Sequence, residues 1–176
     1  MTPTPETRPR GNRARNLVVV ESPTKARTVK NILGDDYEVI ASVGHVRDLP
    51  PYGYGVESVE KLDFTPKYVV VKDKRRGVDK SDVVADIAKA AKHATRVFLS
   101  TDPDREGEAI AWHIYEELGL QKLKKPVFRV MINEITKRGV TDAIAHPLPL
   151  NLKLYESQQA RRILDEAIVV RRRHEQ

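Results

Sequence analysis

Residues 97–113 read VFLSTDPDREGEAIAWH, an apolar run that changes abruptly into a segment rich in carboxylates. The run before residue 101 is typical of a buried strand in a parallel sheet. Asp102, Asp104 and Glu106 follow it directly. Carboxylates crowded at the end of a buried strand need a neutralising cation, and hard divalent cations such as Mg²⁺ prefer oxygen ligands. The stretch therefore predicts that Asp102, Asp104 and Glu106 bind Mg²⁺ and assist a reaction on a phosphate.

A purely structural interpretation of the same carboxylates stays open. Acidic residues in the first turn of a helix interact favourably with the helix dipole and need no function for that. A fourth carboxylate, Glu108, lies in the helix expected over 106–118. It points to a different side of that helix, and we expect it to lie at the surface. The metal hypothesis is favoured because alternating carboxylates would otherwise repel one another.

Strands and helices alternate along the chain. Apolar runs rich in β-branched residues predict strands at 17–20, 37–43, 68–72, 96–100 and 127–132. Helical spacing predicts helices at 23–33, around 83–91, at 106–118, between Thr136 and Pro147, and at 152–170. The prolines and glycines of 48–67 predict a long loop. This alternation indicates an α/β fold with an open, mainly parallel sheet and helices on both faces.

Several polar residues should meet at one edge of this sheet. Ligands of open parallel sheets bind beyond the carboxyl ends of the strands. Glu21 and Asp102 each follow a strand, and His45 follows a third. Lys25 lies in the first turn after Ser22 and Pro23, where a cation opposes the helix dipole unless an anion or carboxylates are near. Glu21 and Lys25 suit proton transfer and phosphate neutralisation. A polar residue at a strand end, such as Glu21, and a structural histidine, such as His45, are also common without any function, so both interpretations stay open.

Composition sets the outer limits. The chain has 176 residues, 40% apolar content, no cysteine and a net charge of +6. Much of this charge lies at the two ends, since residues 1–15 hold four arginines and one glutamate and predict a disordered basic tail. Aromatic residues make up only 6%, which disfavours a base-stacking platform. No segment has the apolar length of a membrane span, and we expect a cytoplasmic protein.

The order of five motifs resembles that of bacterial type IA DNA topoisomerases, the topoisomerase I class. They are VESPTKA (20–26), VGHVRDLP (43–50), TDPDREGEAIAWH (101–113), NEIT (133–136) and QQARRILD (158–165). The resemblance implies a Rossmann-like Toprim domain at 16–148. It further implies that 149–165 is a helix resembling the start of the cleavage-strand-binding domain, and 166–176 is a divergent basic end.

The resemblance also implies roles for single residues. Glu21 would lie near the scissile phosphate, Lys25 would contact that phosphate, and Arg105 would lie beside the cleavage site. Mg²⁺ would be bound by the three carboxylates of the opening stretch, with Glu21 as a further candidate ligand. The DNA-binding residues would be His45, Arg47 and Arg161. Adjacent arginines on a helix point about 100° apart, so only one of Arg161 and Arg162 need face a phosphate.

The implied activity is that of an isomerase. Members of this family relax negatively supercoiled DNA by Mg²⁺-dependent cleavage of one strand through a phosphotyrosine link, strand passage and religation, without ATP. The implied partner is a single-stranded segment of underwound duplex, bound by a monomer.

The family pattern ends at about Glu166, and no tyrosine of the chain stands in the sequence context of the family's nucleophile. We expect a Toprim portion, truncated before the tyrosine domain, that does not cleave DNA alone. Two alternatives stay open. One is a standalone Mg²⁺-dependent nucleic-acid-binding module, and the other is a nuclease in which metal-bound water replaces the tyrosine.

Overall fold

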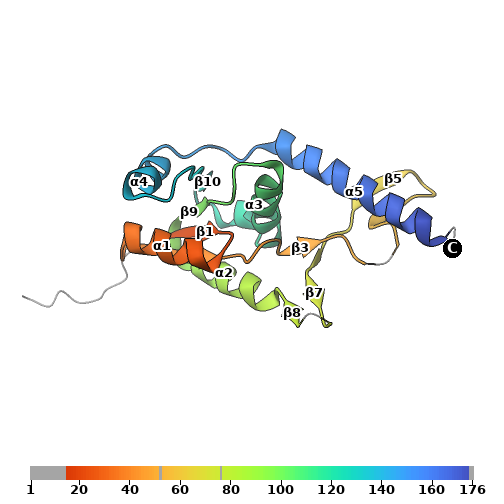
Figure 1. The fold of residues 1–176 in the computed structure, drawn as a ribbon, viewed down its shortest axis with the longest axis horizontal. Helices are drawn as coiled ribbons and strands as arrows, with labels where there is room; N and C mark the ends of the chain where they lie inside the picture. The colour runs from red at the N-terminus through yellow and green to blue at the C-terminus, as the bar shows by residue number, and fades with distance from the viewer. Residues whose placement is uncertain (1–14, 52, 76, 175–176) are drawn as a thin grey trace, which may run out of the picture.

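The central sheet of this computed structural model, which describes residues 15–51, 53–75 and 77–174, is wholly parallel. Its strands run in the order β10-β9-β1-β2 (Figure 1). Their bounds are Arg15–Val20 for β1, Tyr37–Ala41 for β2, Ala94–Leu99 for β9 and Val127–Arg129 for β10. The predicted α/β fold with an open parallel sheet is confirmed.

The apolar run of β1 is buried on both sides because successive residues of a strand point to opposite faces. Leu17 and Val19 enter one hydrophobic cluster, and Val18 and Val20 enter the other. All four are fully buried. A continuous apolar run, rather than an alternating one, is what a central strand covered on both faces requires.

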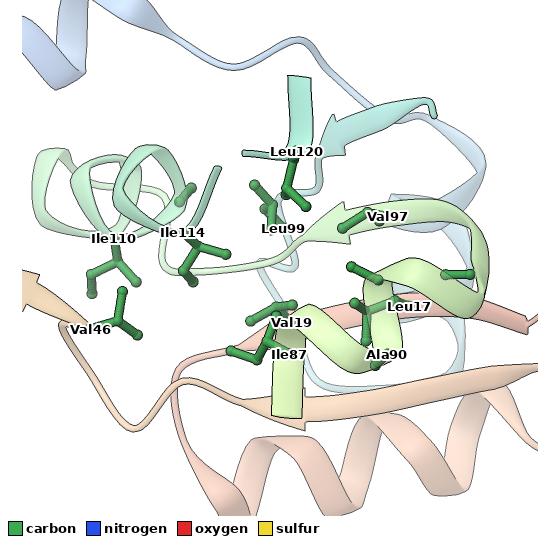
Figure 2. Close-up of a cluster of buried hydrophobic side chains, with 13 residues drawn as sticks. Leu17, Val19, Val46, Ile87, Ala90, Val97, Leu99, Ile110, Ile114 and Leu120 are labelled. Carbon is green, nitrogen blue, oxygen red and sulfur yellow. The ribbon is translucent and has the colours of Figure 1, made fainter. Parts of the chain in front are cut away.

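Two helices cover the first face. They are α2 (Ser81–His93) and α3 (Arg105–Glu117). Ile87 and Ala90 of α2 and Ile110 and Ile114 of α3 pack in one cluster with the inward side chains of β1 and β9 (Figure 2). This cluster packs α3 against the sheet, so that the loop with the predicted ligands Asp102 and Asp104, and Glu106 in the first turn of α3, follow the end of β9.

Two other helices cover the second face. They are α1 (Pro23–Leu33) and α4 (Lys137–Ala145), with Val29 and Val140 in the second cluster. Each begins at the residue that the sequence predicts: Ser22 Oγ accepts from Lys25 N, and Thr136 Oγ1 accepts from Gly139 N. α1 ends at Leu33 as predicted, and Gly34 follows it with φ of 76°.

The prediction of a long loop over 48–67 is wrong, because this part of the chain holds short antiparallel pairs. β4 (Val56–Ser58) pairs with β5 (Asp63–Pro66), and β3 (Arg47–Asp48) pairs with β6 (Val69–Val70). The strand predicted at 68–72 is divided between β6 and β7 (Lys72–Asp73), and β7 pairs with β8 (Val78–Asp79). Strands of two to four residues are too short to leave an apolar periodicity in the sequence.

The last helix, α5, runs from Leu152 to His174. It begins where predicted and continues past Asp165, since neither glycine nor proline interrupts it. α5 packs along α3 and extends past the sheet towards β5 (Figure 1). A short 3₁₀ turn, η1 (Leu120–Leu123), follows α3.

The predicted basic tail lies outside the described residues up to residue 14, and Arg15 already belongs to β1. Within the described ranges, no helix combines the length and apolar character needed to cross a membrane.

Candidate functional site

The carboxyl edge of the sheet brings Glu21, Lys25 and Asp102 together, as predicted. The backbone N–H of Asp102 donates to Glu21 Oε1 at 2.6 Å. Lys25 Nζ donates to Asp102 Oδ1 at 2.8 Å. Glu21 lies just beyond β1, Asp102 lies beyond β9, and Lys25 lies in the first turn of α1. Two segments far apart in sequence, residues 21–25 and the loop at Asp102, thus meet around one pair of carboxyl groups.

The two carboxyl groups have opposite electrostatic surroundings. Burial raises the pKa of Glu21, and the nearby Asp102 charge raises it further. The hydrogen bond from Lys25 lowers the pKa of Asp102. Two adjacent carboxyl groups whose pKa values are pushed apart are the arrangement expected of an acid beside a permanent anion.

The acidic loop that follows Asp102 is shaped by the start of α3. Asp104 is exposed and caps this helix, since its Oδ1 accepts from Gly107 N at 2.7 Å. Gly107 lies against the backbone of Asp102: a Cβ at Gly107 would lie 1.9 Å from the Asp102 carbonyl oxygen. Only glycine permits this close approach. Gly107 is a residue of the site that the motifs alone do not identify, although a glycine in the first turn of a helix is a signal of close packing.

His45 and Glu106 extend the site along the edge. His45 Nε2 lies 3.4 Å from Glu106 Oε2, and the Glu106 side chain is 71% exposed. Arg105, predicted to lie beside the cleavage site, is exposed on the first turn of α3. These residues are therefore open to a ligand from solvent.

A strained turn holds His45 in place. Val43 has φ of 56° and Gly44 has φ of 79°, so a β-branched residue adopts the left-handed conformation. Lys80, a buried residue, donates from Nζ to the Val43 carbonyl oxygen, and Gly44 N donates to Glu21 O at 3.2 Å. The turn is thus tied to the same edge as Glu21.

The donor set suits Mg²⁺ in its chemistry. Asp102, Asp104 and Glu106 offer carboxylate oxygens, which this ion prefers. In the ranges that the structure describes, no three Asp, Glu or His side chains already converge as a metal site. Exposed side chains change rotamer within nanoseconds, so Asp104 and Glu106 can turn towards Asp102 when a cation removes their repulsion. The carboxylates fit the ion in ligand type, and its binding stays a prediction.

Arg47 lies below the surface rather than on it. Its Nε donates to His113 Nδ1 at 2.6 Å, its guanidinium pairs with Glu116, and it lies over the Tyr68 ring. Its contact with DNA stays a prediction. His113 is buried, and burial, followed by the charges of Arg47 and His45, lowers its pKa to about 3.

The two adjacent arginines of α5 point in different directions. Arg161 is exposed, whereas Arg162 donates from Nε and Nη2 to the two carboxylate oxygens of Asp48, at 2.9 and 3.0 Å. Arg161 is therefore the one open to a phosphate, and its role in DNA binding stays a prediction.

The expectation that Glu108 lies at the surface is wrong. Its side chain is 1% exposed and pairs with Arg129, whose Nε lies 2.7 Å from Glu108 Oε2. Glu108 is buried because α3 packs on the sheet with one side and on α5 with another. A sequence signal existed: Arg129 interrupts an apolar strand, and a buried arginine requires an acidic partner.

Comparisons with known proteins agree with this arrangement. Residues 16–135 match the family model described as Toprim domain. The structure is also similar to full-length topoisomerase I from Thermotoga maritima, with a TM-score of 0.72 and 42% sequence identity. The similarity covers 86% of this chain and 24% of that one, so the chain matches about a quarter of the length of that protein.

Proposed function

Because the chain belongs to the Toprim domain family, we propose that it is the Toprim portion of a type IA DNA topoisomerase. It supplies the phosphate- and metal-handling half of the site that cuts and reseals one DNA strand. The observation that carries the proposal is the contact of Glu21 and Lys25 with Asp102 at the carboxyl edge of the sheet. The similarity to Thermotoga maritima topoisomerase I supports it.

Each residue of the cluster has a distinct task in this proposal. Lys25, at the amino end of α1, attracts the scissile phosphate with its own charge and with the helix dipole. Glu21, whose raised pKa favours the protonated form, gives its proton to the sugar oxygen that leaves on cleavage and takes it back on religation. Asp102 stays ionised beside Lys25.

Mg²⁺ would be held by Asp102, Asp104 and Glu106, with Glu21 as a further candidate ligand. When bound, the ion supplies positive charge that neutralises these carboxylates and stabilises the phosphate. Arg105 and His45 lie beside these ligands and would contact the same DNA strand. Arg161 would hold the strand further along α5. Arg47 is assigned to DNA binding by resemblance only, since its guanidinium is already paired.

The nucleophile of the proposed reaction is a tyrosine from a segment other than the described residues. Tyr155 is held by hydrogen bonds, since its hydroxyl donates to Glu116 Oε2 at 3.3 Å and accepts from Gln159 Nε2 at 3.1 Å. Burial raises the pKa of Tyr155 and of Tyr68, which disfavours the phenolate. We infer that the chain alone binds single-stranded DNA as a monomer and does not cut it.

Binding of a labelled single-stranded oligonucleotide at several salt concentrations tests this proposal. Lys25→Ala should weaken binding and reduce the slope of log K against log salt by about 1, the change expected for one lost phosphate contact. Arg27→Ala is the matched control, because Arg27 is exposed on the same helix and points about 200° away from Lys25. Equal effects of the two substitutions would contradict the proposal.

Plasmid relaxation and nicking assays with Mg²⁺ separate the alternatives. We expect neither reaction from this chain. Robust relaxation would overturn the assignment of the nucleophile to another segment. Mg²⁺-dependent nicking that Asp104→Ala abolishes would indicate a nuclease instead, with metal-bound water as the nucleophile.

A further inference from the structure

The guanidinium of Arg129 is fully buried at the point where β9 becomes the acidic loop. Its Nε donates to Glu108 Oε2 at 2.7 Å. Its Nη1 donates to the carbonyl oxygens of Leu99 and Thr101, at 3.0 and 2.7 Å, and its Nη2 donates to the carbonyl oxygen of Asp102 at 2.7 Å. One rigid planar group thus holds three carbonyls of the segment that carries the predicted metal ligands.

These hydrogen bonds fix the backbone of the acidic loop, in addition to placing a positive charge beside it. A guanidinium presents its N–H groups in a fixed fork, and a lysine ammonium at the same place could not reach the same set of acceptors. Gly107 approaches Asp102 from α3 and leaves no room for a side chain. The backbone at Asp102 is therefore held by the Arg129 fork and by the start of α3.

The other oxygen of Glu108 joins this assembly to α5. Asn151 N donates to Glu108 Oε1 at 2.6 Å, and Asn151 Oδ1 accepts from Leu154 N at 3.1 Å, which caps α5. The backbone of Arg129 pairs with that of Leu148 through two hydrogen bonds, of 2.7 and 2.8 Å. The segment that leads into α5 is thus fixed to the same buried pair that holds the acidic loop.

We propose that Arg129, through Glu108, is a positioning residue that couples the conformation of the acidic loop to the seating of α5. Bound Mg²⁺ steadies the loop and, through this pair, the first turns of α5. Reciprocally, a bound DNA strand that holds α5 in its packed position raises the affinity of the acidic loop for Mg²⁺, because coupling between two binding events is mutual. This inference rests on the proposed function, which places Mg²⁺ at the loop.

Titration of the chain with Mg²⁺ by calorimetry, combined with amide hydrogen exchange along α5, tests the coupling. Arg129→Lys keeps the charge and loses the fork, and it should weaken Mg²⁺ binding by the folded chain by about tenfold, the lower range for residues that orient metal ligands. Mg²⁺ should slow exchange at residues 152–158 in the wild type and have little effect there in the variant.

Arg96→Lys is the matched control. Arg96 lies near the opposite end of β9 and donates from Nε to Asn16 Oδ1 at 3.0 Å, so the same change of residue alters the same strand away from the loop. It should leave both Mg²⁺ affinity and the exchange response of α5 unchanged. Unfolding curves of each variant identify conditions in which the chain is folded, so that loss of fold is not counted as loss of affinity.

The outcomes separate this inference from the proposed function. Mg²⁺ binding that is equally tight in folded Arg129→Lys and in the wild type overturns the coupling alone. A wild type that binds no Mg²⁺ overturns both. If Arg129→Lys does not fold, Asn151→Ala is the second variant, since it removes the cap of α5 at an exposed position. It should weaken Mg²⁺ binding by about fivefold, within the range of typical couplings, and an unchanged affinity overturns the coupling.

Discussion

Glu106 and Glu108 lie two residues apart on α3 and have opposite environments. The first is 71% exposed beside His45, and the second is 1% exposed against Arg129. The exposed carboxylate adds repulsion to an edge that already holds Asp102 and Asp104, whereas the buried one satisfies a guanidinium. The acidic edge is thus held by a buried pair behind it: the exposed region is the proposed ligand site, and the buried pair fixes the backbone from which that site is built.

Removal of the Arg129 side chain should cause the largest loss of stability on the buried side of α3. Arg129→Ala leaves Glu108 as an unpaired buried charge and should lower the free energy of unfolding by about 3–5 kcal/mol. Urea denaturation followed by circular dichroism measures this loss. Replacing both residues by leucine should restore only part of the stability: no unpaired charge remains, but the carbonyl oxygens that Arg129 satisfied lose their donor. A double variant as unstable as Arg129→Ala would show that the charge is not the cause.

The close contact between Gly107 of α3 and the acidic loop gives the next largest expected effect. In Gly107→Ala the new Cβ would lie 1.9 Å from the Asp102 carbonyl oxygen, so the loop must move. Stability should fall by about 1–3 kcal/mol, as for other overpacked sites, and Mg²⁺ binding by the folded chain should weaken.

Gly139→Ala is the control for that substitution. Gly139 has the same position after the capping residue of α4, and its Cβ would lie 2.3 Å from the Glu134 carbonyl oxygen. It should lose a similar amount of stability without a change in Mg²⁺ affinity. If Gly139→Ala weakened Mg²⁺ binding as much, the special role of Gly107 would be disproved.

His113, on the buried side of α3, makes the free energy of unfolding depend on pH. Its pKa is lowered to about 3, so below its ordinary pKa of 6.5 the unfolded chain takes up a proton that the folded chain does not. Above about pH 6.5, His113 is neutral in both states and does not lower the free energy of unfolding. As the pH drops from there towards 3, the free energy of unfolding falls by at most about 1.4 kcal/mol per pH unit. The charged and titratable groups facing it are Arg47, His45, Tyr68 and Tyr155.

Urea unfolding at about pH 7.5 and about pH 5.5 measures this effect. His113→Asn retains an acceptor for Arg47 and cannot titrate, so its stability should fall less between the two pH values than that of the wild type. Equal losses in the two proteins would mean that other groups govern the acid response.

Substitution of the exposed Glu106 should cause the smallest change in stability. Glu106→Gln should alter the free energy of unfolding by no more than about 0.5 kcal/mol, as is usual for exposed positions. Its Mg²⁺ affinity should nevertheless fall, because a neutral amide is a weaker ligand for a hard cation than a carboxylate. Calorimetric titration with Mg²⁺ decides the matter, and an unchanged affinity would remove Glu106 from the proposed metal site.

The sequence was sufficient for features that depend on local pattern. The doubly buried β1, the caps at Ser22 and Thr136 and the meeting of Glu21 with Asp102 all follow from the run of apolar residues and the rule for parallel strand ends. The partner of Glu108 could not be deduced in this way. Arg129 is 21 residues away, and Glu108 is buried because α3 packs between the sheet and α5, which no local pattern encodes.

The short antiparallel pairs of residues 47–79 were missed for another reason. β3, β6, β7 and β8 are two residues long and are held by backbone hydrogen bonds rather than by a buried face. Arg47 shows a related limit. A motif places it among polar residues of the site, but only the fold shows that His113 and Glu116 already occupy its guanidinium.

The turn at Val43 has a consequence for protein engineering. A β-branched residue in the left-handed conformation costs about 1–3 kcal/mol, so a search for heat-resistant variants should select Val43→Gly. The same substitution would keep the carbonyl that Lys80 holds but widen the range of backbone conformations at residue 43, which lets His45 move away from Glu106. Thermal improvement at this position would therefore come with a less well-ordered edge around Glu106, and heat tolerance alone would be a misleading criterion for choosing variants.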